Sequence, residues 1–171
     1  DPGPGRPSLD GETIFEIGSI TKTFTATLLA AMARDGEVSL SEPVARLLPA
    51  GARIPSTASR EITTLDLATH TSGLPTLPTN FSPADPGNPY ADYTMQLLDE
   101  FLTAYALPRP PGTGFQYSNL GYGLLGVALA HRAGESFAEL VTSRILTPLN
   151  MRSTGLTLAE EQLTRLAQGH D

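Results

Sequence analysis

Apolar residues recur at helical spacing through most of the chain, between clear start and stop signals, and this pattern predicts a mainly α protein. Helices are expected over residues 19–34, 44–48, 64–72, 95–105, 119–132, 137–146 and 158–168. Three of them follow capping boxes, formed by Ser39 with Glu42, Ser136 with Glu139 and Thr157 with Glu160. Only residues 12–17 alternate polar and apolar side chains, so one short strand is expected there.

The charge balance limits the partners of the chain. Its 171 residues include 11 Lys and Arg against 18 Asp and Glu, for a net charge of −7. We therefore expect no binding to nucleic acid or to an anionic membrane surface. No apolar run approaches the ~18 residues of a membrane helix, so no membrane span is expected. Residues 1–8, rich in Pro and Gly, are expected to be flexible and do not resemble a signal peptide, which leaves the compartment open.

One serine and the only lysine of the chain stand one helical turn apart at the start of the first helix. In the segment Phe-Glu-Ile-Gly-Ser-Ile-Thr-Lys (15–22), Ser19 and Lys22 would share one face. A serine hydroxyl becomes a strong nucleophile when a neighbouring base takes its proton, and a neutral lysine amine is such a base. The helix N-terminus would also favour an oxyanion beside Ser19. Alone, the short and common pair favours a capping serine followed by a solvated lysine.

A second candidate cluster, Tyr117-Ser118-Asn119, lies between a loop rich in Pro and Gly (107–116) and a helix. A tyrosine near a lysine can shuttle protons. An asparagine can hold the lysine through its carbonyl and a substrate amide through its NH₂ group. On its own, the tripeptide also fits a packed aromatic residue followed by a helix cap.

Four segments occur together in the order found in one enzyme superfamily. Residues 15–22 are followed by Leu-Ala-Thr-His-Thr-Ser-Gly-Leu-Pro (67–75), Pro-Gly-Thr-Gly-Phe-Gln-Tyr-Ser-Asn-Leu-Gly-Tyr-Gly (111–123) and Leu-Thr-Pro-Leu-Asn-Met (146–151). With these segments the chain resembles the class C β-lactamase-related serine hydrolases. This superfamily includes class C β-lactamases, D-alanyl-D-alanine carboxypeptidases, D-aminopeptidases and family VIII carboxylesterases. The resemblance covers nearly the whole chain.

The resemblance implies a role for each candidate residue. Ser19 would be the acylated nucleophile, Lys22 its proton acceptor, Tyr117 the general base and proton shuttle, and Asn119 the side chain that orients Lys22 and the substrate. His70 lies in a segment that is structural in the family, so it is expected to be a helix-end residue and not the base. The implied substrate is a small-molecule ester, a D-peptide or a β-lactam, and Gly-Ser-Ile-Thr-Lys (18–22) is more similar to the esterase and peptidase branches than to a dedicated β-lactamase. The implied chemistry needs no cofactor and no metal.

The resemblance also implies an α+β fold, of the type of serine β-lactamases and penicillin-binding proteins, of which this chain holds mainly the helical lobe. The family's third motif, Lys/His-Thr/Ser-Gly on a strand across the cleft, is not found after Asn119. Residues 9–171 are therefore expected to form a partial catalytic domain, with the sheet lobe of the same protein largely missing. One oxyanion donor would come from that lobe, and one donor contributes about 3 kcal/mol. The chain alone is expected to be poorly active.

Other function classes find less support. Gly121, Gly123 and Gly126 match the dinucleotide fingerprint but follow no strand, so close helix packing is expected to explain them. The chain has no cysteine and its three histidines stand far apart, so no metal site is expected. Two hypotheses remain. The intact set of four residues favours a serine hydrolase, and the missing third motif favours a non-catalytic binding or scaffold module with the same fold.

Overall fold

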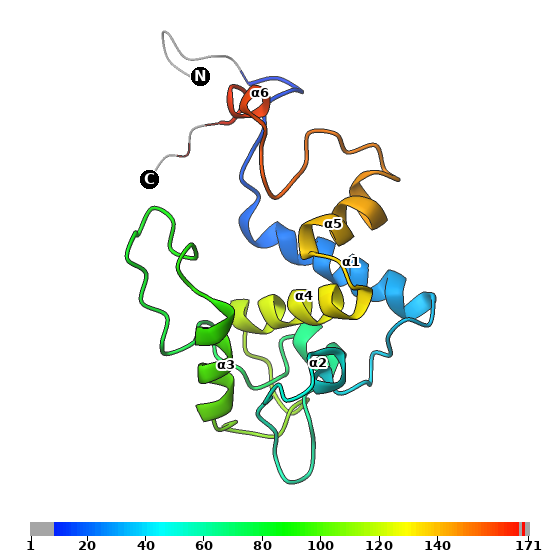
Figure 1. Cartoon of the computed structure of the whole chain (residues 1–171), viewed down its shortest axis with the longest axis vertical. Helices are drawn as coiled ribbons and strands as arrows, with labels where there is room; N and C mark the ends of the chain where they lie inside the picture. The colour runs from blue at the N-terminus through cyan, green and yellow to red at the C-terminus, as the bar shows by residue number, and fades with distance from the viewer. Residues whose placement is uncertain (1–8, 168, 170–171) are drawn as a thin grey trace.

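Helix α4 (Asn119–Ala133) is the central element of the fold (Figure 1). It contacts α1 (Thr21–Arg34), α2 (Thr64–Ala68), α5 (Phe137–Val141) and the 3-10 turn η2 (Val44–Leu47). A helix covered on several sides has to be apolar nearly all round, and the sequence of α4 meets this requirement. Its neighbours therefore fix the position of its N-terminus.

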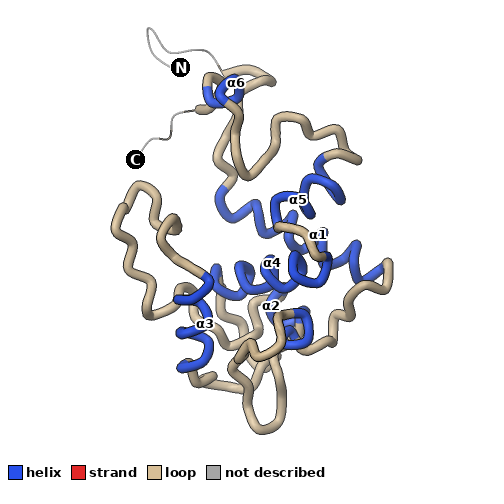
Figure 2. Tube along the Cα trace, in the orientation of Figure 1, coloured by secondary structure: helices blue, strands red, loops and turns tan. Residues whose placement is uncertain are grey.

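The remaining elements are also helical in this computed structural model, which describes residues 9–167 and 169. They are η1 (Gly18–Ile20), α3 (Met95–Ala104), the π-helical turn η3 (Thr142–Leu146) and α6 (Glu160–Leu163). Figure 2 shows no strand in these described residues, where β-pairing is limited to isolated bridges. The expected flexible segment, residues 1–8, lies outside the described part. No described helix is long and apolar enough to cross a membrane.

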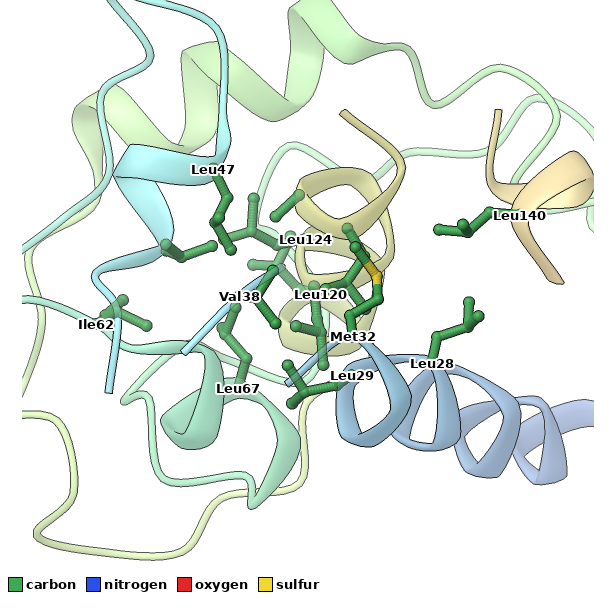
Figure 3. Close-up of a cluster of buried hydrophobic side chains, with 14 of the residues drawn as sticks. Leu28, Leu29, Met32, Val38, Leu47, Ile62, Leu67, Leu120, Leu124 and Leu140 are labelled. Atoms are coloured by element: carbon green, nitrogen blue, oxygen red, sulfur yellow. The ribbon is translucent and has the colours of Figure 1, made fainter. Parts of the chain in front are cut away.

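The hydrophobic core joins α1 to α4 (Figure 3). Leu28 and Met32 of α1 are fully buried together with Leu124 of α4, and Leu47 and Leu67 complete the cluster from η2 and α2. Burial of one such side chain contributes about 1.5–3 kcal/mol. This packing fixes the position of α1 relative to α4, the two helices that carry Lys22 and Asn119.

Local capping signals are confirmed for several helices. The side chains of Thr94 and Ser136 accept hydrogen bonds from the backbone N–H groups of Leu97 and Glu139, at the starts of α3 and α5. Gly134 ends α4 in the left-handed conformation, with φ of +71°. The helix that begins at α5 continues into the π-helical turn η3 and so reaches the expected end.

Two expected elements near the N-terminus differ in the structure, one in kind and one in helix type. In place of a strand over 12–17 there is one parallel bridge between Ile14 and Leu166, because the described residues provide no neighbouring strand for the rest of the segment. The helix expected after Ser39 is only the short turn η2, with Pro43 at its N-cap. A proline disfavours helical backbone for the residue before it, here Glu42, so the helical turn begins only after Pro43 and not at the capping box.

The last helix is shorter than expected. It is α6, which begins at Glu160. The capping box expected from Thr157 and Glu160 does not form at its start. Instead, Gln162 Oε1 accepts a hydrogen bond from the N–H of Ala159 at 2.9 Å, which places the cap two residues later in the chain. A helix of one turn results, in place of the expected range 158–168.

Candidate active site

Ser19 lies in the first turn of a helix. The turn η1 leads without a break into α1, which places Ser19 and Lys22 one turn apart at its start. Gly18, directly before Ser19, has a φ of +50°, a left-handed conformation that costs a residue with a side chain about 1–2 kcal/mol. The glycine turns the chain into the helix and leaves Ser19 exposed, while Lys22 is half-buried.

Four side chains meet at this turn. The Nζ of Lys22 donates hydrogen bonds to Ser19 Oγ at 3.1 Å and to Asn119 Oδ1 at 2.7 Å. The hydroxyl of Tyr117 donates to Ser19 Oγ at 2.7 Å. The Ser19 hydroxyl is therefore contacted by an amine and a phenol at the same time. The structure brings together all four residues that the sequence singled out.

The loop after α2 holds the segment that carries Tyr117 and Asn119. The carbonyl of Thr76 accepts a hydrogen bond from the N–H of Asn119 at 3.0 Å, and the Thr76 hydroxyl donates to the carbonyl of Tyr117 at 2.9 Å. Buried Ser118 donates to the carbonyl of Pro75 at 2.6 Å, and its Oγ also caps α4. These bonds satisfy backbone groups at the helix start that have no partner within the helix.

Lys22 changes the acidity of the phenol beside it. Its Nζ lies 4.8 Å from the ring centre of Tyr117. The pKa of Tyr117 is lowered from its ordinary value, first by the interaction with Lys22 and second by the hydrogen bond with Ser19. A phenol of lowered pKa is suited to proton transfer. Burial instead raises the pKa of Tyr122, whose hydroxyl donates to the carbonyl of Ala68 at 2.7 Å.

His70 lies behind Tyr117 and makes no hydrogen bond with Ser19 in the described structure. Its Nδ1 accepts from the N–H of Ser118 at 3.0 Å, and its carbonyl accepts from the N–H of Gln116 at 2.7 Å. Its ring centre is 4.6 Å from that of Tyr117. Because Nδ1 accepts, the ring is neutral, and burial followed by the charge of Lys22 lowers the pKa of His70. This histidine supports the segment that carries Tyr117.

The contribution of Thr76 was missed from the sequence. Its position after Pro75 indicated only a loop, because the acceptor that it offers to α4 is a backbone carbonyl. One signal was available. The first turn of α4 contains no acidic residue, so its N–H groups need acceptors from outside the helix.

Solved structures share this arrangement of helices. The fold matches a crystal structure of a β-lactamase/D-alanine carboxypeptidase from Yersinia pestis with a TM-score of 0.87 and 36% identity, over 95% of this chain and 46% of that one. It matches a class C β-lactamase with a TM-score of 0.78 and 28% identity, over 95% of this chain and 42% of that one. The fold is therefore the helical part of the β-lactamase fold, as expected from the sequence.

Sequence comparison defines the family. A family model described as Beta-lactamase matches residues 2–171. The chain is 34% identical to the D-alanyl-D-alanine-carboxypeptidase/endopeptidase AmpH of Escherichia coli K12, over 94% of this chain and 41% of that protein. It is 35% identical to a β-lactamase of Pseudomonas fluorescens, over 93% of this chain and 41% of that protein. The chain belongs to the Beta-lactamase family, and it spans less than half the length of these relatives.

Proposed function

We propose that the protein carrying this chain is a serine hydrolase that forms an acyl-enzyme on Ser19. The observation that supports this proposal is the position of the Lys22 amine, between Ser19 Oγ at 3.1 Å and Asn119 Oδ1 at 2.7 Å. The phenol of Tyr117 completes the arrangement at 2.7 Å from the same Oγ. A nucleophile within hydrogen-bond reach of a base, which a third group orients, is the general pattern of covalent catalysis.

The reaction would run in two steps. Ser19 Oγ attacks the carbonyl carbon of an ester or amide, and its proton passes to the pair formed by Tyr117 and Lys22. The bond to the leaving group breaks as that group takes the proton, which leaves an acyl ester on Ser19. Water then attacks the ester, and its proton returns to Ser19 through the same pair. Acyl transfer to water therefore leaves the enzyme unchanged.

Two donor groups at the site are available for the substrate. The backbone N–H of Ser19 donates to no described residue and can donate to the developing oxyanion. The side-chain carbonyl of Asn119 accepts a hydrogen bond from Lys22. The NH₂ group of Asn119 donates to no described residue. That NH₂ group can bind a carbonyl of the substrate.

The substrate class within this reaction is also a proposal. The names of the relatives, a carboxypeptidase/endopeptidase and β-lactamases, favour a D-peptide or a β-lactam. An ester fits the same four residues, since ester and amide bonds are cleaved through the same acyl-enzyme. The alternative is a binding or scaffold module that keeps the residues without turnover.

We further propose that a sheet lobe of the same protein packs against the N-terminal part of this chain. Large apolar side chains are exposed there, with Phe15 at 54% and Ile20 at 59%, and Leu156 is exposed at 54% across a groove that Ile17 lines. Exposed apolar surface of this kind marks an interaction site. The lobe would supply the second oxyanion donor, so the chain on its own would be poorly active.

Labelling separates the hydrolase from the scaffold. The protein that carries this chain should react with a fluorophosphonate and with a fluorescent penicillin, and peptide mapping should place both adducts on Ser19. A scaffold would take up neither reagent. An adduct on another residue would contradict the assignment of the nucleophile.

Removing the phenol of Tyr117 should slow the reaction and change its pH dependence. Tyr117→Phe keeps the ring but cannot transfer a proton, so turnover should fall by about 10²–10⁴-fold. If the phenolate is the base, wild-type activity rises with pH through the pKa of Tyr117, which is lowered from its ordinary value. This ascending limb should be absent from the kcat/KM profile of the variant. A limb that persists unchanged would assign the titration to another group.

His70→Ala should lower stability but leave the activity of the folded enzyme largely intact. The variant loses the acceptor for the N–H of Ser118 and the ring packed on Tyr117, whereas the contacts of Ser19 with Lys22 are kept. Thermal unfolding and titration of active sites with a fluorophosphonate would give the stability and the turnover per active molecule. Loss of turnover in a folded, labelled variant would make histidine part of the proton transfer.

A further inference from the structure

The carboxylate of Asp66 is buried, with 3% of its side chain exposed, and accepts more hydrogen bonds than its helix requires. In the capping box of α2, it accepts from the N–H and the hydroxyl of Thr63 at 2.9 Å and 2.6 Å. It also accepts from Nη2 of Arg60 at 2.9 Å and 3.1 Å, and from the hydroxyl of Thr71 at 3.3 Å. A capping box uses only the bond from the backbone N–H to this carboxylate. The bonds with Arg60 and Thr71 therefore need a separate explanation.

Arg60 connects this carboxylate to the loop between α3 and α4. While its Nη2 binds Asp66, its Nη1 donates to the carbonyl of Pro111 at 2.7 Å. The N–H of Gly112 donates to the carbonyl of Thr71 at 2.8 Å. Two adjacent residues of the loop are thus bound by Arg60 and Thr71, which both bind Asp66. The buried carboxylate therefore fixes this point of the loop relative to α2.

Gly112 allows the close approach of the guanidinium group. Its φ is +81°, and a Cβ at this position would overlap Nη1 of Arg60 and lie 2.9 Å from Cζ. The glycines of α4 are less crowded. A Cβ would lie 3.2 Å from its nearest neighbour at Gly121 and 3.3 Å at Gly126, as expected from close packing. At Gly123 it would meet no atom within 4 Å, so packing does not explain that glycine.

The loop leads into Tyr117, whose hydroxyl donates to Ser19 Oγ at 2.7 Å although the side chain is 39% exposed. A side chain that is only partly packed depends on its backbone for an exact position. Thr76 binds the carbonyl of Tyr117 and so holds the C-terminal side of this residue. We infer that Arg60 and Asp66 are positioning residues, which hold the loop before Tyr117 and thereby place its phenol. The inference rests on the proposed function.

Arg60→Met tests the inference because it removes the guanidinium group and keeps a long side chain. The Asp66 carboxylate retains its three other donors, so the variant is expected to fold. In the protein that carries this chain, kcat for p-nitrophenyl acetate should fall at least about tenfold, since a displacement of 1 Å can cost about 10²-fold. Arg132→Met is the matched control. Arg132 pairs with Glu42 and is 38% exposed, against 43% for Arg60, and its loss should leave kcat unchanged.

The pKa of Tyr117 reports the position of the phenol, which a loss of stability alone would not change. It is lowered from its ordinary value, first by the interaction with Lys22. The titratable groups that face the phenol are Lys22 of α1, His70 after α2 and Tyr122 of α4, and Arg60→Met changes none of them. A relaxed loop lets the phenol move away from Lys22. The pKa of Tyr117 should then rise toward its ordinary value.

This rise can be measured by ¹³C NMR of the protein labelled at the Cζ atoms of tyrosine. Tyr117→Phe assigns the signal of Tyr117. The titration of that signal should shift to higher pH in Arg60→Met and stay at the wild-type position in Arg132→Met. An unchanged titration together with an unchanged kcat in Arg60→Met overturns the inference.

Gly112→Ala tests the same contact from the loop, and it keeps the inference testable if Arg60→Met does not fold. The added methyl group displaces the guanidinium, so the Tyr117 signal should shift in the same direction. Because both changes break one contact, the double variant should differ little from Arg60→Met. Gly36→Ala adds a methyl group at a φ of +75° with no atom within 4 Å, so it should leave the signal unchanged. An equal shift in Gly36→Ala would assign the effect to backbone strain and overturn the inference.

The Tyr117 signal does not depend on turnover, so the inference and the proposed function can fail separately. A shifted titration without any fluorophosphonate adduct on Ser19 overturns the hydrolase proposal and supports the positioning of Tyr117. An adduct on Ser19 with an unchanged titration in both Arg60→Met and Gly112→Ala overturns the positioning and leaves the hydrolase proposal in place.

Discussion

Ser19→Ala is expected to abolish covalent labelling by a fluorophosphonate and to lower turnover by about 10⁴–10⁶-fold, the range seen when a member of a nucleophile–base unit is removed. Ser19 Oγ is the atom on which the amine of Lys22 and the phenol of Tyr117 both converge, at 3.1 Å and 2.7 Å. Without it, the two proton-transfer groups remain but have no nucleophile to activate. Intact-mass measurement of the protein after incubation with the probe would show the loss directly.

An exposed serine away from lysine is the matched control. Ser41 hydrogen-bonds Ser39 on the surface, with 3.1 Å between the two Oγ atoms. Ser41→Ala should label and turn over as the wild type does. Full labelling of Ser19→Ala would mean that another residue is the nucleophile, and the proposed function would then lose its basis.

Lys22→Arg is expected to be nearly as damaging, although the positive charge is kept. A guanidinium does not give up its proton at any pH that the protein experiences, so it cannot accept the proton of Ser19. Its planar fork also cannot reproduce the two bonds that a single Nζ makes to Ser19 and Asn119. Lys22→Ala removes both the charge and the base. The turnover of Lys22→Arg should fall to within about tenfold of that of Lys22→Ala, which corresponds to a difference of about 1.4 kcal/mol in activation free energy.

The comparison of Lys22→Arg with Lys22→Ala identifies what the lysine contributes. If the charge alone mattered, by lowering the pKa of Tyr117, the arginine variant would keep much of the activity and the alanine variant would not. Pre-steady-state release of p-nitrophenol would show which step slows. An active Lys22→Arg enzyme together with an inactive but folded His70→Ala enzyme would replace the lysine mechanism by a histidine mechanism.

Much of the helical fold could be predicted because its signals are local. The caps at Thr94 and Ser136 and the left-handed stop at Gly134 act within one or two turns of the residue that provides them. Of the two differences, one has a local cause and the other depends on tertiary context. After the capping box at Ser39 only the 3-10 turn η2 forms, beginning past Pro43, and residues 12–17 form no strand because the described residues offer no neighbouring strand.

The sequence by itself determined the candidate residues, since four segments in the order of one superfamily carry the resemblance that assigns Ser19 with Lys22 and Tyr117 with Asn119. Only the tertiary structure decided that the two pairs meet, because the contact between Lys22 and Asn119 spans 97 positions and depends on the packing of α1 against α4. Local spacing cannot encode a contact of that range. The support from Thr76 likewise passes through a backbone carbonyl, which every residue type offers equally.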